Sequence, residues 1–327
     1  MNEIITNTMK GAAMGIAEVI PGVSGGTIAF ITGIYERLLN DIKNLNFGLI
    51  TTWRKEGFTA FWKQCDGTFF TSLMGGMSVG LVIGIFTITS LLETHPEPLW
   101  GFFFGLIIAS CIVLRKEIIS WNLGAYLMLI AGAVIAYAIT IISPAEGSSN
   151  LVYVFFSAVL AICALILPGI SGSFILLLLG MYSIIIPTLK HFLTTFDFSG
   201  LSIIATFAAG CITGLLLFSR ALTWLFSKYK FETFAMMIGF MIGSLNKIWP
   251  WRNVDKISIK ESGVIQSVSD YSTFLSLDRE SYKILKEINV LPSQYQLGDP
   301  KLVMTIITTL IGFTIVIFIS KYSKIKA

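Results

Sequence analysis

The feature that most constrains this chain is a series of long apolar stretches. A helix needs about 20 apolar residues to cross a bilayer, and stretches close to that length lie at 69–92, 98–114, 122–143, 203–226, 232–249 and 302–320. Charged residues make up only 13% of the chain, whereas soluble domains carry about 25%. With this few charged residues, the chain could not cover an apolar core with polar surface in water. We therefore predict an all-α polytopic membrane protein.

Two further apolar stretches, residues 11–40 and 151–190, are interrupted by proline and glycine. Each piece of the first stretch is too short to cross a membrane at about 1.5 Å per residue, which predicts a re-entrant helical hairpin. The second stretch is long enough for either a re-entrant hairpin or two full spans. Unsatisfied backbone groups are costly in hydrocarbon, so we expect both breaks where protein or a water-filled cavity surrounds them.

The two breaks repeat one another in sequence. The segment Pro21-Gly-Val-Ser-Gly-Gly-Thr27 aligns without a gap on the segment that begins at Pro168, and Gly33-Ile-Tyr35 aligns on Gly180-Met-Tyr182 at the same offset of 147 residues. Downstream, a second block aligns at an offset of 134 residues, with Gly76, Gly80, Gly105 and Ser110 matching Gly210, Gly214, Gly239 and Ser244. Two gapless blocks in the same order predict an internal duplication.

The duplication divides the chain into repeat one, residues 1–145, and repeat two, residues 146–327. Each repeat contains a broken hairpin followed by three transmembrane helices. Repeat one adds an interfacial segment at 41–68, and repeat two adds a polar extramembrane insertion at 251–300. An odd number of spans separates the two copies, so we expect an inverted repeat, an arrangement typical of secondary transporters.

Basic residues in the short loops predict the orientation. The loops at 93–98 and 143–146 hold no lysine or arginine, whereas Arg115, Lys228 and Lys321 lie in or near connections on the other side. By the positive-inside rule, both the N-terminus and the C-terminus are expected in the cytoplasm. Asn246 and Lys247 then fall at the outer boundary, where they either attract an anionic headgroup or act as ordinary interfacial anchors.

The residues at the breaks suit an anion. Ser24 and Ser171 stand where they would cap the helix that follows, and free amides at a helix N-terminus are a common phosphate site. The alternative is that these turns are only structural. We predict a substrate site made of Glu18, Pro21, Gly22, Ser24, Gly25, Gly26, Thr27, Pro168, Gly169, Ser171, Gly172, Ser173 and Arg220.

Two of these residues carry charge inside apolar segments, where a charge costs about 3 kcal/mol or more. Glu18 is predicted to carry a proton or to pair with a base, the alternative being a hairpin tip that water reaches. Arg220 is predicted to grip a phosphate or to pair with Glu18. The alternative for Arg220 is a side chain that snorkels to the inner surface.

These motifs resemble a known family. Glu18-x-x-Pro21-Gly-Val-Ser-Gly-Gly-Thr27, the second break through Gly180-Met-Tyr182, and Gly239…Gly243-Ser-Leu-Asn-Lys-Ile-Trp-Pro250 resemble the bacterial polyprenyl-phosphate transporters of the PopT type. The resemblance runs over nearly the whole chain, although the insertion at 251–300 looks longer than is usual in that family. It implies a protein of the bacterial inner membrane that moves undecaprenyl phosphate from the outer to the inner leaflet, for recycling in peptidoglycan and other envelope polymer synthesis, with a coupling proton or cation.

Rival functions fit the sequence less well. A transporter or channel for a small anion or ion shares the same architecture. An intramembrane serine protease would use the Gly-x-Ser-Gly sequence at each break, but the two histidines, His95 and His191, lie outside the predicted mid-membrane segments. We therefore expect no enzyme, no cofactor, no metal site and no nucleic-acid partner, and the sequence is compatible with an oligomer.

Overall fold

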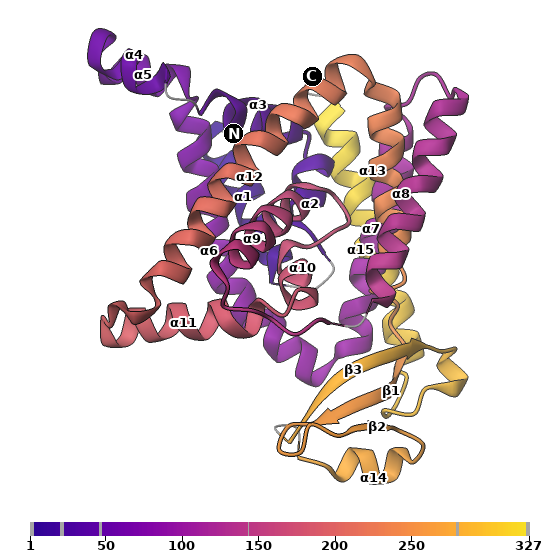
Figure 1. Ribbon diagram of the computed structural model, residues 1–327. Helices are drawn as coiled ribbons and strands as arrows, with labels where there is room; N and C mark the ends of the chain where they lie inside the picture. Colours follow the sequence, from indigo (N-terminus) through magenta and orange to yellow (C-terminus); the bar gives the residue numbers. More distant parts are fainter. Residues whose placement is uncertain (1–2, 20–22, 46–47, 143, 279–280, 325–327) are drawn as a thin grey trace.

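The computed structural model describes residues 3–19, 23–45, 48–142, 144–278 and 281–324, and most of them are helical (Figure 1). Within these residues, five helices are long and apolar enough to cross a membrane, and they coincide with five of the six predicted spans. They are α6 (Gly67–Thr94), α7 (Pro96–Arg115), α8 (Leu123–Ile141), α12 (Leu201–Lys228) and α15 (Leu302–Lys324). The multi-pass prediction is confirmed for the described residues, and the candidate spans are all helical.

The sixth predicted span, 232–249, is shorter than expected. Helix α13 (Lys230–Ser244) has 15 residues, which at 1.5 Å per residue is about 22 Å, against a hydrocarbon core of about 30 Å. The helix ends in a turn in which the Lys247 amide donates to the Ser244 carbonyl at 2.9 Å. The apolar composition continues past Ser244, although the helix itself does not.

Each broken segment folds as three helices. The first contains α1 (Glu3–Glu18), α2 (Gly25–Ile31) and α3 (Tyr35–Asn44), and the second contains α9 (Leu151–Ile166), α10 (Gly172–Leu178) and α11 (Tyr182–Thr195). Helices α10 and α11 meet at a bend of 108°. The second segment is therefore not a pair of unbroken spans, and the part after its proline bends back on itself.

Matched glycines end the two short helices. Gly33 follows α2 with φ +72°, and Gly180 follows α10 with φ +67°, values that favour glycine. In both places the amide of the residue after the glycine donates a hydrogen bond to the carbonyl five residues earlier. Ile34 donates to Ala29 at 3.0 Å, and Met181 donates to Leu176 at 2.9 Å. This is the Schellman arrangement, and it explains why the sequence repeat includes these two glycines.

Helix packing follows the same duplication. Helix α1 packs on α6 as α9 packs on α12, and α7 packs on α15 as α13 packs on α8. A methyl group added to Gly76 would strike the Thr8 carbonyl, and one added to Gly210 would approach the Phe155 carbonyl at 2.5 Å. Thr8 and Phe155 are 147 residues apart, while the two glycines are 134 apart, so both sequence offsets recur in these contacts.

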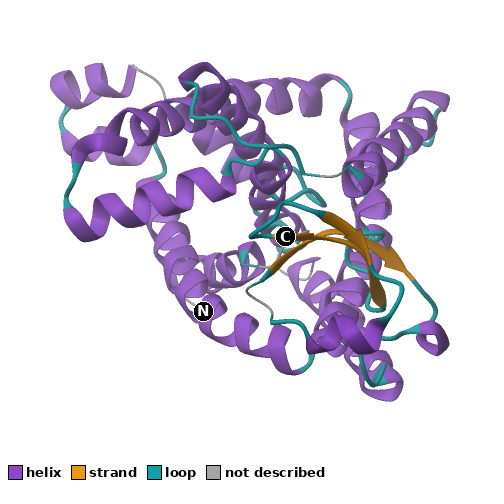
Figure 2. Cartoon of the chain, turned by 60° about the horizontal axis from the view of Figure 1, so that its bottom comes forward, coloured by secondary structure: helices purple, strands orange, loops and turns teal. Residues whose placement is uncertain are grey.

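The insertion at 251–300 contains a small antiparallel sheet, so the chain as a whole is not purely helical. Its order is β2-β1-β3, with β1 (Arg252–Ile259), β2 (Ile265–Ser267) and β3 (Tyr282–Asn289). Helix α14 (Tyr271–Ser276) packs against the sheet and helps to form a core of its own. We call this unit the sheet subdomain; it lies at one end of the helices, opposite both termini (Figure 1), and Figure 2 shows its strands in orange.

The described residues of the predicted interfacial segment 41–68 are mostly helical. It holds the end of α3 with α4 (Gly48–Glu56) and α5 (Phe58–Gln64), and Trp53 and Phe58 expose more than half of their surface. Exposed aromatic rings of this kind are typical of membrane interfaces. Two single 3-10 turns complete the described elements, η1 (Phe198–Gly200) and η2 (Pro292–Gln294).

Candidate functional site

The two breaks touch each other inside the protein. The Ser24 hydroxyl donates to the Leu165 carbonyl at 3.1 Å, and the Gly169 amide donates to the Thr27 hydroxyl at 3.1 Å. Ser24, Thr27 and Ser171 are all fully buried. A methyl group on Gly26 would lie 2.5 Å from the Ile166 carbonyl, so glycine is needed for this close approach. We call this contact the junction.

The amides at the first break already have partners. The Gly25 amide donates to Glu18 Oε1 at 2.7 Å, and the Gly26 amide donates to the Ser24 hydroxyl at 3.0 Å. The cap predicted for Ser24 is therefore confirmed, and the Glu18 carboxylate occupies the position that an anion would take. A bound anion could reach the Gly25 amide only if the Glu18 side chain moved away. Pro21 and Gly22 lie outside the described residues.

The second break differs in its capping. Ser171 begins α10, but its side chain accepts no amide hydrogen bond and instead lies 2.7 Å from the Ser173 hydroxyl. The predicted Ser171 cap is therefore wrong. The reason lies at one repeat position, because Ser173 supplies a competing hydroxyl where the first repeat has Gly26.

Glycines hold the second break against its neighbours. Gly169 has φ +87°, and a methyl group there would lie 2.7 Å from the Met241 amide nitrogen of α13. A methyl group on Gly172 would lie 2.6 Å from the Ala161 carbonyl of α9. Pro168 is buried in the same turn. The described residues of the two breaks are thus closely packed against their neighbours.

Arg220 stands apart from the junction. Its side chain is exposed on α12, and among the described residues no hydrogen bond or ion pair joins it to Glu18 or to either break. Its role in phosphate binding stays a prediction. Neither serine hydroxyl bonds a histidine; His191 pairs instead with Asp197 at 3.2 Å on the surface.

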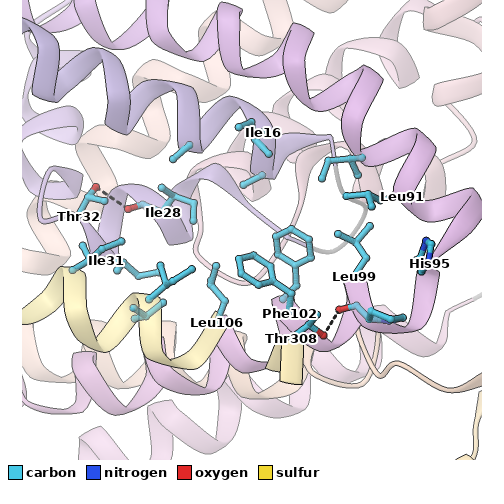
Figure 3. Close-up of a pocket in the computed structure, with 18 of the residues that line it drawn as sticks. Ile16, Ile28, Ile31, Thr32, Leu91, His95, Leu99, Phe102, Leu106 and Thr308 are labelled. Carbon is cyan, nitrogen blue, oxygen red and sulfur yellow. Dashed lines mark hydrogen bonds between the residues drawn. The ribbon is translucent and has the colours of Figure 1, made fainter. Parts of the chain in front are cut away.

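An apolar cavity of about 630 Å³ lies beside the first break (Figure 3). Helices α1, α2, α6, α7 and α15 line it, with Ile16 and Ile28 near the break and Leu99, Phe102 and Leu106 across from them. The Thr308 hydroxyl in its wall donates to the Pro98 carbonyl at 2.6 Å, so its proton is already engaged within the protein. A space of this kind suits hydrocarbon.

A second cavity, of about 360 Å³, lies beside the second break where the helices meet the sheet subdomain. Lys247, Arg252 and Glu287 line it, together with apolar residues of α8 and α10. Sequence reasoning placed Lys247 at the outer boundary but missed Arg252 and Glu287. They lie 35 residues apart on β1 and β3, and the sequence alone carried no signal that these strands pair.

Comparisons with known proteins agree on one family. A family model described as VCA0040-like, undecaprenyl phosphate translocase-like, matches residues 14–266. A polyprenyl-phosphate transporter of Vibrio cholerae serotype O1 is 43% identical over 259 residues, which cover 79% of this chain and 82% of that protein. A polyprenyl-phosphate transporter of Staphylococcus aureus is 32% identical over 258 residues, covering 75% of this chain and 86% of that protein. No solved structure matches the chain.

Proposed function

The chain belongs to the VCA0040-like, undecaprenyl phosphate translocase-like family, and from that premise we propose that it carries undecaprenyl phosphate across the bacterial cytoplasmic membrane. The proposed direction is from the outer to the inner leaflet, which returns the lipid carrier for another round of envelope polymer synthesis. The protein acts as a transporter and not as an enzyme, in line with its relatives.

The observation that carries this proposal is the junction. Two copies of one motif, from opposite halves of the chain, meet through the Ser24–Leu165 and Thr27–Gly169 hydrogen bonds. Broken helices that meet within a bundle of apolar helices are where secondary transporters bind polar substrates. Irregular backbone at membrane depth is stable only when protein or a cavity surrounds it, and the buried junction meets that condition.

We take the two halves to be inverted relative to each other. The matched pairings of α1 with α6 and of α9 with α12 support this, as does the position of α3 near the termini and of α11 near the opposite end in Figure 1. Rocking of such halves about the junction would expose it to each side of the membrane in turn. Both termini are then cytoplasmic, and the sheet subdomain faces outward.

The phosphate would bind as the junction opens. The Gly25 amide becomes available when the Glu18 carboxylate leaves it, and the turn after Ser171 and Arg220 on α12 would contribute the remaining contacts. Protonation of Glu18 would help it to leave. A membrane potential negative inside opposes inward movement of an anion by about 2.3 kcal/mol per charge per 100 mV, so coupling to a proton or cation assists this direction.

The apolar cavity accounts for part of the prenyl chain. It lies beside α2 of the first break, and its wall consists largely of Ile, Leu and Phe side chains (Figure 3). A prenyl chain placed there would keep its contact with hydrocarbon while the phosphate crosses. The rest of the chain would remain in the lipid.

The test is leaflet-to-leaflet movement of a fluorescent polyprenyl phosphate in proteoliposomes. We compare wild type, the double variant Ser24→Ala with Ser171→Ala, and Arg220→Ala. The control double variant is Ser78→Ala with Ser227→Ala, whose hydroxyls bond only within their own helices. We expect the lipid to move more slowly in the Ser24→Ala, Ser171→Ala double variant and in Arg220→Ala, and at the wild-type rate in the control.

Two outcomes would contradict the proposal in different ways. If the wild-type protein does not accelerate movement of the lipid, the transport function is wrong. If the lipid moves equally fast in wild type and in both site variants, the function stands but the predicted site is wrong. Movement of inorganic phosphate in place of the lipid would favour a small-anion transporter.

A further inference from the structure

The cavity between the helices and the sheet subdomain has charged groups on one side and apolar groups on the other. Lys247, Arg252 and Glu287 face it from the α13 turn and from strands β1 and β3. Phe174 and other apolar residues of α8 and α10 form the opposite wall. The cavity therefore has the shape of a site for an amphipathic ligand with one polar end.

Positive charge dominates this cavity. Lys247 Nζ and Arg252 Nη1 both reach the same carboxylate atom, Glu287 Oε2, at 3.3 and 2.8 Å. Lys286 also lines the cavity, and its ammonium pairs with Asp255 at 3.0 Å. Two carboxylates, Glu287 and Asp255, thus face three basic side chains, which leaves one net positive charge. An anion entering here would meet a surplus of positive charge.

The two cations that share Glu287 are only partly hydrated. The Arg252 side chain is 11% exposed, and its guanidinium stacks over the Trp100 ring at 4.7 Å. The Lys247 side chain is 25% exposed, and its ammonium lies 5.4 Å from the centre of the Phe174 ring. Charges held away from bulk water attract an anion more strongly than charges on an open surface.

Lys247 connects this cavity with the second break. It also lines a small adjoining pocket whose other walls include Gly169, Ser171 and Ser244. Phe174, one turn into α10, borders both spaces. An anion bound at Lys247 therefore lies next to the turn that forms half of the junction.

We propose that this cavity is a docking site for a phosphate monoester, which Lys247 and Arg252 hold before it passes to the second break. This inference rests on the proposed transport function and adds a first binding step to it. Lys247 makes the longer bond to Glu287, so it is the cation that turns to the phosphate, while Arg252 stays against Glu287 and Trp100. Inorganic phosphate shares the headgroup chemistry, but the apolar wall of α8 and α10 favours a phosphate that carries a prenyl chain.

Binding to the purified full chain tests this site directly. Farnesyl phosphate, farnesol and inorganic phosphate are titrated separately into the protein in detergent, with tryptophan fluorescence as the readout because Trp100 lies against Arg252. We expect Lys247→Gln to weaken farnesyl phosphate binding about tenfold or more, the usual effect of losing one charge-assisted contact. Lys283→Gln, on the same strand as Glu287 but outside the cavity lining, should leave the affinity unchanged.

A variant of opposite sign separates binding from mere structural support. Glu287→Gln removes the carboxylate that competes for the two cations, so farnesyl phosphate should bind severalfold more tightly. If Glu287 served only to hold the sheet subdomain, this variant would weaken binding, as Lys247→Gln does, and the proposal would be overturned. Inorganic phosphate or farnesol binding as tightly as farnesyl phosphate would also overturn it.

Transport by the same variants distinguishes this inference from the function beneath it. If wild type moves the lipid and Lys247→Gln binds it with unchanged affinity, the docking site is wrong and the transport function stands. If binding depends on Lys247 but wild type moves no lipid, the docking site stands and the transport function is wrong.

Discussion

Replacing Thr27 with valine isolates the hydrogen bond that joins the two breaks. The Gly169 amide donates a hydrogen bond to the hydroxyl of the fully buried Thr27 at 3.1 Å. Valine has nearly the same shape as threonine but cannot accept this hydrogen bond. Hydrogen bonds between membrane helices contribute about 0.6 kcal/mol on average and at most about 1.7 kcal/mol. A buried amide left without any acceptor adds a desolvation cost, so we expect a total loss of about 1–3 kcal/mol.

A matched control exists on α15. Thr305 is 1% exposed, and its hydroxyl has no hydrogen-bond partner among the described residues. Thr305→Val makes the same chemical change but breaks no bond, so its effect should be near zero or slightly stabilising. Comparing the two variants removes the effect of exchanging a hydroxyl for a methyl group.

The assay is unfolding of the purified protein in mixed micelles with increasing SDS. At the midpoint for wild type, a loss of about 1.4 kcal/mol changes the ratio of folded to unfolded protein about tenfold. Thr27→Val should therefore unfold at clearly lower SDS than wild type, while Thr305→Val should not. Equal behaviour of the two variants would refute the reasoning, because it would mean that no hydrogen bond of this kind holds the junction together.

Two further predictions follow from the backbone and from a buried carboxyl. Gly169→Ala should destabilise the protein more than Gly57→Ala. Both glycines have φ near +87°, but a methyl group on Gly57 meets open space whereas one on Gly169 meets α13. We expect overpacking to add a loss of about 1–3 kcal/mol in Gly169→Ala, seen as a lower SDS midpoint, and equal losses in the two variants would contradict the packing. Burial raises the pKa of Asp41 to about 6, aided by the charge of Asp66 and opposed by that of Arg37, while an unfolded aspartate titrates near 3.9. Because the folded protein then holds this proton more tightly than the unfolded chain, wild type should lose stability relative to Asp41→Asn as the pH rises from about 4 to 6. Thermal unfolding at several pH values measures this, and a difference in melting temperature between the two proteins that stays constant over this range would contradict the shift.

The membrane helices could be predicted from the sequence because hydropathy and span length decide them almost alone. The breaks could be predicted because proline and glycine interrupt apolar sequence, and because the repeat places Gly33 and Gly180 at equivalent helix ends. The end of α13 could not, since Leu245 and Ile248 continue the apolar pattern after the helix has turned. Composition indicates what is buried, but not where the backbone turns.

The sheet was missed for a local reason. A half-buried strand normally alternates apolar and polar residues, but the pairing of β1 with β3 shifts register between Val254 and Ile257. These two buried residues are therefore three apart and not two or four, which hides the alternation. The cation pair at Glu287 depends on the same pairing of strands, so it could not be predicted either.

The capping difference shows a limit of reasoning from repeats. Ser24 and Ser171 occupy equivalent positions, yet only Ser24 accepts an amide hydrogen bond. The residue two positions after each serine decides this, because Ser173 offers a hydroxyl and Gly26 does not. Equivalent positions in a duplication share a backbone path without sharing every contact.

Hydrogen exchange at the second break tests most directly whether the junction holds in the resting protein and parts for its substrate. The Gly169 amide, bonded to Thr27, should exchange slowly in nanodiscs without ligand, and faster when a polyprenyl phosphate is added. The same segment should not respond to the uncharged polyprenol. Rapid exchange without ligand, or exchange that the phosphorylated lipid leaves unchanged, would contradict the account.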